Sequence, residues 1–596
     1  MHEVHERPLA DAPSSSTALL NKAPVSSARA MDIYTGPVYS LSLHAQFPMN
    51  GYRCRIVERG GAGTNETGKY GSVPGVCCRM HAAAACEDAR LTRTTWGESR
   101  STPLLLSRQK KNIYKEVNIP VQEIPLADII YPVSARFCTS SSSPTMLAKS
   151  LLSGALVVFH ALMAAAAPAL PHSPRTAPIV PSQDPFYAVP ADIGSSQPGA
   201  ILRHRSPPAA IAVFGVDPVR LAASYQLQYR TTDSLGNATA TVLTVMVPHG
   251  ANPRRVLSYQ VAEDAASPDC APSYGLQRGS ARGTVLTQAE MLLIEAALEQ
   301  GWVVVLPDYE GPQAMYLAWR LAGQATLDGI RAALASTPVT GIQPDATVAM
   351  WGYSAGSDAT AWAAELHPTY APELAIAGAA IGGTTPNITN VIATTNRGPF
   401  AGLLPAGVQG LVRQYPALAA VVDRYLRPAH RAAFAQTRRQ CLLADASEFF
   451  YQDVLGMFTD PGFYRTDPVV VRILDEIALG QAVPRIPLYW YKSTHDEVSP
   501  VADTDAVYDR YCAAGATVEY VRDEASEHAS AAWTGAPRAL AWLKHVMEGG
   551  AVRPGCSKET TISSLLDMST VKVLPGVILD ALLDLVGKPV GPIMFG

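Results

Sequence analysis

The pentapeptide GYSAG, residues 352–356, carries the strongest chemical signal in the sequence. It has the pattern G-x-S-x-G and lies between the apolar run TVAMWG, which is typical of a strand, and an alanine-rich run, which is typical of a helix. A serine in a sharp strand-to-helix turn needs small neighbours, because its backbone must bend tightly to expose the hydroxyl. The motif in this context predicts that Ser354 is a nucleophile.

A serine hydroxyl needs a histidine as general base near neutral pH, and the histidine needs a carboxylate that orients it. In α/β-hydrolases the acid and then the histidine follow the serine along the chain. Asp496 comes just after the strand-like run 486–491, and His528 comes in the loop after the next such run, before the helix-like segment 535–547. Ligands bind at the carboxyl ends of strands in open α/β sheets. The sequence therefore predicts Ser354, His528 and Asp496 as a catalytic triad.

Three other histidines and one other carboxylate compete for these roles. Glu497 is the alternative acid, because it stands beside Asp496 in the same loop. His495 is a poorer base, because adjacent side chains in a short loop cannot easily put the imidazole between the carboxylate and the serine. His367, at a helix end, and His430, in an apparent insertion, are better explained as surface histidines.

Short apolar runs bounded by turn residues alternate with helix-like segments along the chain. One such segment, 287–301, has Thr287 as a candidate N-cap, Glu290 three residues later and Gly301 at its end. This alternation predicts an α/β fold, in which helices cover both faces of a mostly parallel sheet. The strand-like runs are residues 239–248, 255–260, 302–308, 347–352, 374–383, 486–491 and 517–521.

An insertion is expected between the nucleophile and the acid. The 141 residues between Ser354 and Asp496 exceed what one helix and one strand require. The excess, about 385–484, contains apolar patterned segments such as 400–426, which could cap the site. The alternative is an ordinary helical subdomain without a binding role.

The run MLAKSLLSGALVVFHALMAAAAPAL, residues 146–170, has the composition of a secretory signal peptide. Lys149 precedes an apolar stretch over 151–167, which has about the right length for a signal and is short for a membrane span. A transmembrane anchor is therefore the weaker alternative. We expect residues 146–167 to be a signal peptide that is removed on export.

The segment before this run differs in character. Residues 1–145 show no sustained hydrophobic period and hold five of the nine cysteines. We expect Met146 to be the biological start, with the preceding segment an upstream extension of the gene model; a disordered leader is the alternative. The folded domain then spans 168–596.

The folded region retains four cysteines, an even number in a chain expected to enter an oxidising compartment. Two disulfides are expected, and spacing alone permits three connectivities. A metal site is disfavoured, because no two of these cysteines stand a few residues apart with a histidine partner. The four are Cys270, Cys441, Cys512 and Cys556.

The composition of the chain gives information on its class, its partners and its possible modification. The formal net charge of −4 gives no electrostatic reason to expect nucleic acid, and 48% hydrophobic residues favour a globular fold. Asn237 and Asn387 each begin an N-x-T triplet and are candidate glycosylation acceptors that export would make usable.

A dense series of motifs marks a family resemblance. In chain order stand SYQLQYRTT (224–232), SYQVAEDAASPDCAPSY (258–274), DYEGP (308–312), LDGIRA (327–332), GYSAG, YAPEL (370–374), GPFAG (398–402), DEVSP and SEHAS. Through this series the chain from about residue 184 to about residue 593 resembles the fungal secretory lipase family.

The resemblance implies an α/β-hydrolase fold with the same triad. It adds an oxyanion hole made by the backbone N–H groups of Asp264 and Ala355, each worth about 2.7–4 kcal/mol of transition-state stabilisation. It also implies a mainly helical cap that holds the acyl chain. Our own first candidates for the lining of this cap are Phe400, Leu403 and Leu404, in and just after GPFAG. The implied disulfides are Cys270–Cys441 and Cys512–Cys556.

We therefore expect a secreted triacylglycerol lipase or carboxylesterase that forms an acyl-enzyme and uses no cofactor or metal. Its substrates would be lipids or other esters, met in solution or at a lipid–water interface, with no stable membrane anchor. A secreted serine acyltransferase or peptidase is the main alternative, because a triad does not distinguish an ester from an amide, or water from an alcohol. A non-catalytic binding protein is disfavoured, since all three triad positions are filled.

Overall fold

The computed structural model describes residues 177–566 and 590–592. The expected signal peptide at 146–167 and the segment 1–145 lie outside the described residues.

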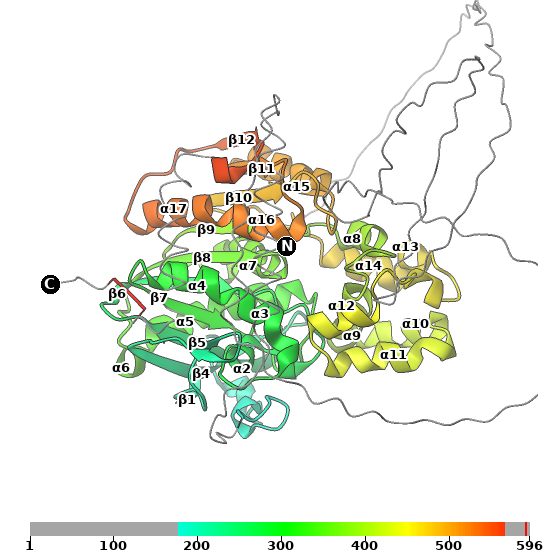
Figure 1. Ribbon diagram of the computed structural model, residues 1–596, viewed down its shortest axis with the longest axis horizontal. Helices are drawn as coiled ribbons and strands as arrows, with labels where there is room; N and C mark the ends of the chain where they lie inside the picture. The colour runs from blue at the N-terminus through cyan, green and yellow to red at the C-terminus, as the bar shows by residue number, and fades with distance from the viewer. Residues whose placement is uncertain (1–176, 567–589, 593–596) are drawn as a thin grey trace, which may run out of the picture. The chain divides into compact units, whose positions relative to one another are not determined.

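A ten-stranded sheet forms the centre of the described chain, with strand order β1-β4-β5-β7-β6-β8-β9-β10-β11-β12 (Figure 1). From β7 to β12 in this order the neighbours are parallel, whereas β1, β4 and β5 pair antiparallel. A separate two-stranded hairpin pairs β2 with β3. The strands are β1 Ile201–Arg205, β2 Ala212–Val213, β3 Asp217–Pro218, β4 Ala223–Thr232, β5 Ala238–Val247, β6 Asn252–Gln260, β7 Trp302–Pro307, β8 Thr347–Tyr353, β9 Ile376–Gly382, β10 Leu488–Ser493, β11 Val518–Asp523 and β12 Cys556–Thr561.

Helices cover both faces of this sheet, which confirms the predicted α/β architecture (Figure 1). Strands such as β7 and β8 are buried along almost their whole length, and a strand covered on both faces reads as a continuous apolar run. One face carries α5 (Trp319–Ala335), α7 (Ala355–Tyr370) and α15 (Val501–Ala513). The other carries α4 (Met291–Leu298) and α17 (Ala536–Met547). The shorter helices α2 (Pro272–Gly275) and α6 (Thr337–Thr340) lie in connections.

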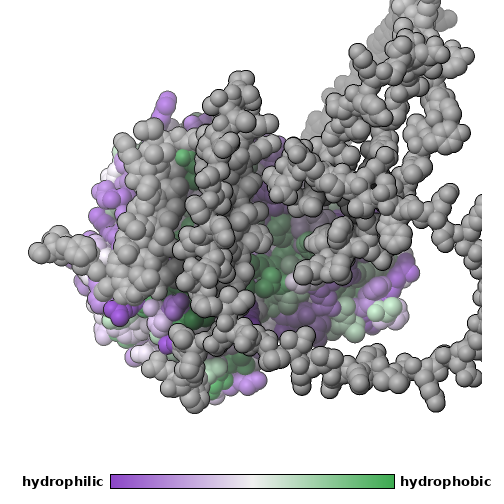
Figure 2. Space-filling model, viewed as in Figure 1, coloured by the Kyte–Doolittle hydropathy of each residue, from purple (hydrophilic) through white to green (hydrophobic). Residues whose placement is uncertain are grey.

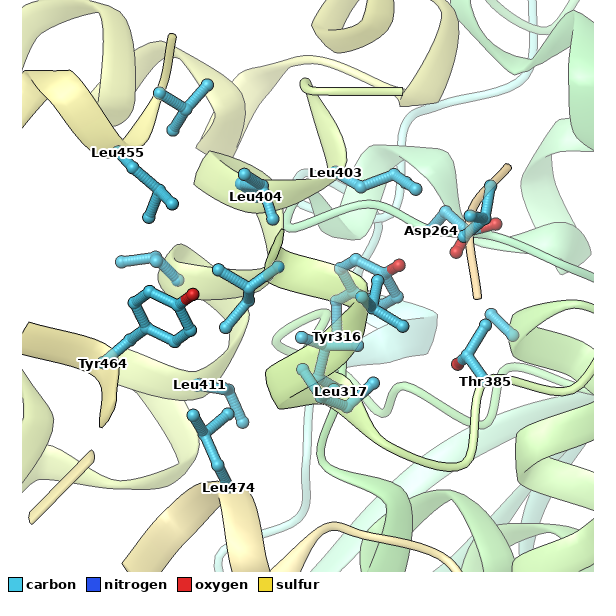
Figure 3. Close-up of a pocket in the computed structure, with 18 of the residues that line it drawn as sticks. Asp264, Tyr316, Leu317, Thr385, Leu403, Leu404, Leu411, Leu455, Tyr464 and Leu474 are labelled. Carbon is cyan, nitrogen blue, oxygen red and sulfur yellow. The ribbon is translucent and has the colours of Figure 1, made fainter. Parts of the chain in front are cut away.

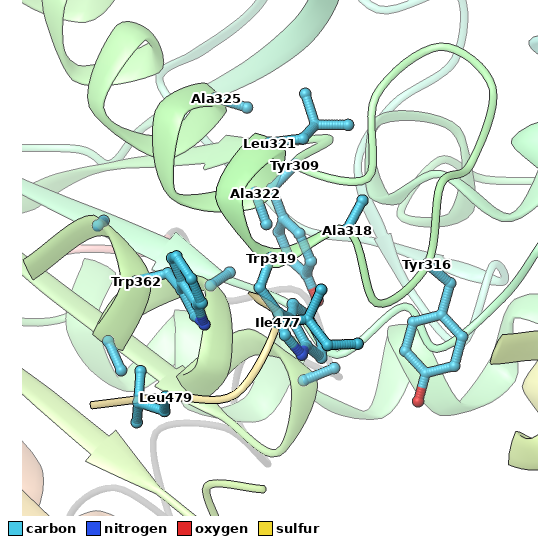
Figure 4. Packing of buried hydrophobic residues seen from close by; sticks show 14 of the residues in the cluster. Tyr309, Tyr316, Ala318, Trp319, Leu321, Ala322, Ala325, Trp362, Ile477 and Leu479 are labelled. Atoms are coloured by element: carbon cyan, nitrogen blue, oxygen red, sulfur yellow. The ribbon is translucent and has the colours of Figure 1, made fainter. Parts of the chain in front are cut away.

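The core on the α5 face is rich in aromatic side chains. Trp319 of α5 and Trp362 of α7 lie close to Ile477 and Leu479, on the chain that returns from the insertion (Figure 4). Helices α5 and α7 approach closely at Gly323, where an added Cβ would come within 2.8 Å of the Trp362 backbone. The returning chain therefore belongs to the same core as the helices that support the sheet.

The helix predicted over 287–301 is broken in two. The structure has α3 (Val285–Ala289) and α4, and Thr287 is buried within α3 instead of capping a helix. The break falls at Glu290, whose carboxylate accepts hydrogen bonds from the Tyr259 hydroxyl and the Ala262 N–H, both at 2.8 Å. This glutamate holds the chain just after β6, so it is not available for a capping box.

The insertion between β9 and β10 is helical and lies beside the sheet domain (Figure 1). We call it the cap. Its helices are α8 (Ile388–Thr395), α9 (Leu403–Gln414), α10 (Pro416–Tyr425), α11 (Arg431–Gln436), α12 (Leu442–Glu448), α13 (Phe463–Thr466) and α14 (Pro468–Glu476). In the space-filling view, apolar side chains are visible where the sheet domain meets the cap, and polar side chains are visible at the left and right edges (Figure 2).

The structure contains both disulfides that the resemblance implied. Cys270 bonds Cys441, which joins the segment after β6 to the N-cap position of α12 in the cap. Cys512 bonds Cys556, which joins α15 to β12 within the sheet domain. Over 177–566 and 590–592, no helix has the length and apolar character needed to cross a membrane.

Candidate active site

Ser354, His528 and Asp496 form a hydrogen-bonded chain at the carboxyl ends of the parallel strands. Oγ of Ser354 lies 2.8 Å from Nε2 of His528. Nδ1 of His528 lies 2.7 Å from Oδ2 of Asp496. When Nδ1–H donates to the carboxylate, Nε2 is left as the acceptor for the serine proton. The structure thus brings together the three residues that the sequence predicted.

Ser354 stands in a strained turn between β8 and α7. Its backbone has φ 52° and ψ −126°, a conformation that residues other than glycine rarely adopt and that clusters at functional sites. A Cβ on Gly352 would lie 2.2 Å from the Gly356 carbonyl oxygen, and one on Gly356 would lie 2.0 Å from the Gln260 oxygen. The two glycines of the motif therefore permit the turn, as the sequence argument supposed.

The loops that carry the acid and the base are tied to each other. The Ser493 hydroxyl, at the end of β10, donates to the backbone oxygen of Ser526 at 2.5 Å. Asp523, at the end of β11, accepts the backbone N–H of Ser526 at 3.0 Å. His528 is the first residue of the short helix α16 (His528–Thr534), whereas we predicted that it lies in a loop. Because His528 is the first residue of a helix, its backbone conformation is fixed, and this helps to fix the direction of its imidazole ring.

The carboxylate of Asp496 is held by backbone and side-chain donors. Its Oδ1 accepts the N–H groups of Val498 at 2.9 Å and Ser499 at 2.7 Å. Its Oδ2 lies 2.7 Å from Nζ of the buried Lys492, besides its contact with His528. Burial alone would raise the pKa of Asp496, but the charges of His528 and Lys492 outweigh it and hold the pKa well below its ordinary value. Asp496 therefore stays ionised, as an orienting acid must.

The competing residues lie elsewhere. Glu497 accepts the backbone N–H of His528 at 2.7 Å and so supports the start of α16 instead of the ring. His495 is exposed, with its Nδ1 3.1 Å from the Thr494 hydroxyl. Nε2 of His367 lies 2.8 Å from the Leu374 carbonyl. His430 belongs to a 3-10 turn in the cap.

Asp264 and Ala355 flank the nucleophile. Asp264 follows β6 by four residues and has φ 49°, a second strained backbone beside Ser354. Burial raises the pKa of the Asp264 carboxyl, and the hydrogen bond that it receives from Tyr316 offsets this only in part. Ala355 begins α7, where backbone N–H groups have no helical partner and favour a negative charge. Both residues line the same cavity as Ser354.

This cavity has about 800 Å³ of empty space, counted to its open mouth. Asp264 and Thr385 lie at one end, and Leu455, Tyr464 and Leu474 lie at the other, inside the cap (Figure 3). Other apolar side chains line the space between them, and these include Leu317, Leu403, Leu404, Val408, Leu411, Val454 and Phe458.

Comparison with known proteins places the chain in a family. Residues 276–553 match the secretory lipase family. Lipase A of Arthroderma benhamiae is 48% identical over 425 residues, which cover 70% of this chain and 90% of that protein. Lipase 2 of Candida albicans is 38% identical over 425 residues, which cover 69% and 90%. The chain belongs to the secretory lipase family. It is a lipase, a carboxylic ester hydrolase, and the predicted family and enzyme class are confirmed.

Solved structures support the same conclusion for the fold of this lipase. The X-ray structure of Candida antarctica lipase A is 31% identical and superposes with a TM-score of 0.62, covering 71% of this chain and 100% of that one. The structure of that enzyme in its closed state is 32% identical, with a TM-score of 0.62 and coverage of 70% and 100%. The predicted α/β-hydrolase fold is confirmed.

Sequence reasoning missed two side chains of the lipase that support the site. Lys492 directly follows the strand-like run 486–491 and belongs to the buried strand β10, where a charged residue is itself a signal of a buried partner. Tyr316 donates to the carboxyl of Asp264, and no local pattern in the sequence marks it.

The proposed lining residues divide into two groups. Leu403 and Leu404 line the cavity, as expected. Phe400 instead packs edge-on against His528, with ring centroids 6.2 Å apart. This aromatic contact shields one side of the imidazole.

The two glycosylation candidates differ in setting. Asn237 is exposed in the turn between β4 and β5, with its amide donating to Asp233 at 2.9 Å. Asn387 is half-buried and caps α8 by accepting the Asn390 N–H. The described residues hold no cluster of three metal-ligating side chains.

Proposed function

We propose that this lipase hydrolyses triacylglycerols and other fatty acyl esters through a serine acyl-enzyme. The observation that carries the proposal is that Ser354 is hydrogen-bonded to His528 and also lines an apolar cavity. A nucleophile at the end of an apolar space fits an ester carbonyl whose acyl chain is buried there.

In the acylation step, Oγ of Ser354 attacks the ester carbonyl while Nε2 of His528 takes its proton. Asp496 stabilises the imidazolium that forms. The new oxyanion accepts hydrogen bonds from the backbone N–H groups of Asp264 and Ala355. Each such donor typically contributes about 2.7–4 kcal/mol of transition-state stabilisation.

Breakdown of the intermediate releases the alcohol, which takes the proton from His528. A water molecule then attacks the acyl-enzyme, with His528 acting again as base, and the fatty acid leaves. In this scheme Ser354 is regenerated and no cofactor takes part.

The cavity favours a lipase over a peptidase on the same fold. A peptidase subsite for extended peptide needs polar partners for backbone groups, whereas the space beyond Asp264, Tyr316 and Ser354 is lined by aliphatic and aromatic side chains. Each buried methylene of an acyl chain should contribute up to about 0.8 kcal/mol. Acyl transfer to an alcohol uses the same acyl-enzyme, so that reaction differs only in the second acceptor.

Secretion is part of the proposal. Its support is the signal-like run at 146–167, together with two disulfides that require an oxidising compartment. In this scheme residues 168–596 are the mature enzyme, with the cap at about 385–484, and residues 1–145 are absent from it. Asn237 is the better-exposed glycan site. N-terminal sequencing of the secreted enzyme that found any part of 1–145 would contradict this boundary.

The central test is Ser354→Ala combined with a chain-length series. The variant should lose ester hydrolysis by about 10⁴-fold or more, because nucleophile and base act as a unit. With the wild-type enzyme, kcat/KM for p-nitrophenyl esters should rise from acetate toward laurate as the cavity fills, and emulsified triglyceride should be hydrolysed. Substantial activity of a folded Ser354→Ala protein would remove the nucleophile from the scheme. If kcat/KM did not rise along the ester series, the cavity would not be the site that binds the acyl chain.

A further inference from the structure

Lys492 is a charged residue in the interior of the sheet domain. It lies on β10, four residues before Asp496, and its side chain is completely buried. Its Nζ lies 2.7 Å from Oδ2 of Asp496 and donates to the backbone oxygen of Thr384 at 2.9 Å. A buried lysine needs such partners, because an unpaired ammonium in the interior is strongly unfavourable.

Lys492 and His528 donate to the same carboxylate oxygen. Oδ2 of Asp496 is 2.7 Å from Nζ of Lys492 and 2.7 Å from Nδ1 of His528. The backbone N–H groups of Val498 and Ser499 occupy Oδ1. Four donors saturate the carboxylate, and two of them, the Lys492 ammonium and the catalytic base, share one oxygen.

Thr384 does not by itself require a cation. Its hydroxyl accepts hydrogen bonds from the Trp490 indole at 2.9 Å and from the Ser357 hydroxyl at 3.0 Å. Neutral donors from β10 and α7 therefore already hold this residue where the chain leaves β9. The charge of Lys492 acts chiefly on Asp496 and, through it, on His528.

We propose that Lys492 is a positioning residue that disfavours the protonation of His528 and so moves the acidic limit of the lipase's activity to lower pH. The proposal rests on the triad proposed above. A neighbouring positive charge disfavours the imidazolium form, and one oxygen atom separates the ammonium from the imidazole N–H. Lys492 also neutralises part of the Asp496 charge that would otherwise favour protonation of His528.

The other charged groups near these residues are acidic. Asp358 of α7 and Asp503 of α15 both interact electrostatically with Lys492. His528 is near Asp496, interacts with the charge of Asp264 and has its backbone N–H bound by Glu497. The neutral Tyr353 packs against the His528 ring at 5.6 Å and donates to its backbone oxygen. Removing Lys492 therefore leaves His528 among groups that favour its protonation.

The test is the pH dependence of kcat/KM for Lys492→Met and Lys492→Gln, whose side chains carry no charge. With a soluble p-nitrophenyl butyrate assay and product detection after alkaline quench, the acidic limb should move to higher pH by about one unit or more. Well below that limb, each variant should be about tenfold less active than wild type, relative to its own plateau. Lys492→Gln can still donate hydrogen bonds and serves if the methionine protein does not fold.

Two controls separate this role from a structural one. Ser357→Ala removes a neutral hydrogen bond to Thr384 and should leave the limb in place. Burial raises the pKa of the Asp358 carboxyl to about 7. Asp358→Asn removes this acid, so the acidic limb of that variant cannot come from the titration of residue 358. The proposal is overturned if folded Lys492 variants keep the wild-type limb, even at reduced activity, or if Ser357→Ala moves it equally. Failure of the triad itself would appear separately, as activity retained by Ser354→Ala.

Discussion

The triad and the acyl cavity meet at Ser354, yet they are stabilised in different ways. The triad residues follow strands of the sheet, and hydrogen bonds of 2.7–2.8 Å between their side chains fix their geometry. The cavity is lined mainly by apolar side chains from short cap helices, which contact without directional bonds. Chemistry needs fixed atoms, whereas an acyl chain needs only volume and an apolar surface.

The cap is nevertheless attached to the catalytic edge at more than its two chain ends. Besides Cys270–Cys441, the Arg413 guanidinium of α9 donates to the backbone oxygen of Ala266 at 2.5 Å and also to that of Gln313. Ala266 follows Asp264 by two residues. The cap is thus joined to the segment that carries the proposed oxyanion donor, so a change in the cap can reach the chemistry.

The largest expected effect separates the two acids of the Asp-Glu pair. Asp496→Asn should lower kcat by about 10⁴-fold, because the amide no longer fixes the correct imidazole tautomer. Glu497→Gln should lower it by less than about tenfold, since the glutamine oxygen can still accept the backbone N–H of His528. Steady-state kinetics on a soluble ester at pH 8 measures both. Comparable losses in the two variants would mean that the acid is not Asp496 alone.

A smaller effect is expected at the far end of the cavity. Leu474→Trp should fill the space beside Tyr464 and exclude the last few methylenes of a long chain (Figure 3). At up to about 0.8 kcal/mol per methylene, losing two or three corresponds to a loss of up to roughly 15–60-fold in kcat/KM for laurate, with butyrate changed less than about twofold. Leu474→Ala is the matched control and should not penalise laurate over butyrate. Equal losses for both esters in the tryptophan variant would place the acyl chain elsewhere.

The sequence predicted the sheet and the triad better than it predicted the cap and the cavity. Strands β5 to β11 and the order serine, acid, histidine were predictable, because buried strands are continuous apolar runs and catalytic residues follow the carboxyl ends of parallel strands. Strand β4 was not predicted: Gln226 and Gln228 are fully buried, and their amides bond to backbone oxygens of Ser273 and Ala188. Because these buried glutamines are polar, the sequence of β4 did not show the apolar run that is typical of a buried strand.

Other features depended on contacts distant in sequence. The break at Glu290 arises from its bonds to Tyr259 and to the chain after β6, which no helical pattern reveals. Edge strand β12 is exposed and polar, so it lacks the apolar signal of a strand. In the cap, the pattern around 400–426 indicated helices, but which side chains face the cavity is set by the packing of several helices. Phe400 therefore faces His528, while Leu403 and Leu404 line the cavity.

The smallest expected effect is a change in the slope of stability against pH, and it contrasts Asp445 with Asp496. Asp445 of α12 is completely buried, and its carboxyl oxygens have no hydrogen-bond partner among the described residues. Burial, with a smaller contribution from Glu448, raises its pKa to about 8. Asp496 is buried too, but its charged partners lower its pKa. The cap acid is therefore most stable when neutral, and the triad acid when ionised.

The sign of the linkage follows from proton binding. Between pH about 4, where an unfolded aspartate ionises, and about 8, the folded chain binds more protons at Asp445 than the unfolded chain does, so stability falls as pH rises. One such group contributes a slope of up to about 1.4 kcal/mol per pH unit. Glu290, Asp308 and Asp358, with pKa values raised by burial to about 8, 7 and 7, add slopes of the same sign. Asp496 acts oppositely, since its stabilisation persists above pH 4 and is lost only in stronger acid.

Asp445→Asn should therefore make the stability curve shallower without changing the chemistry of the triad. Urea unfolding at pH 5, 6, 7 and 8 should show a smaller loss of free energy per pH unit for the variant than for wild type, with the remaining slope due to the other buried acids. Asp423→Asn is the control, because that cap carboxylate is exposed and paired with Arg431. Parallel curves for wild type and Asp445→Asn would show that water or a rearranged side chain relieves Asp445 in solution. The ionised Asp445 would then be stable in the cap without a charged protein partner, whereas the ionised Asp496 is stabilised by Lys492 and His528.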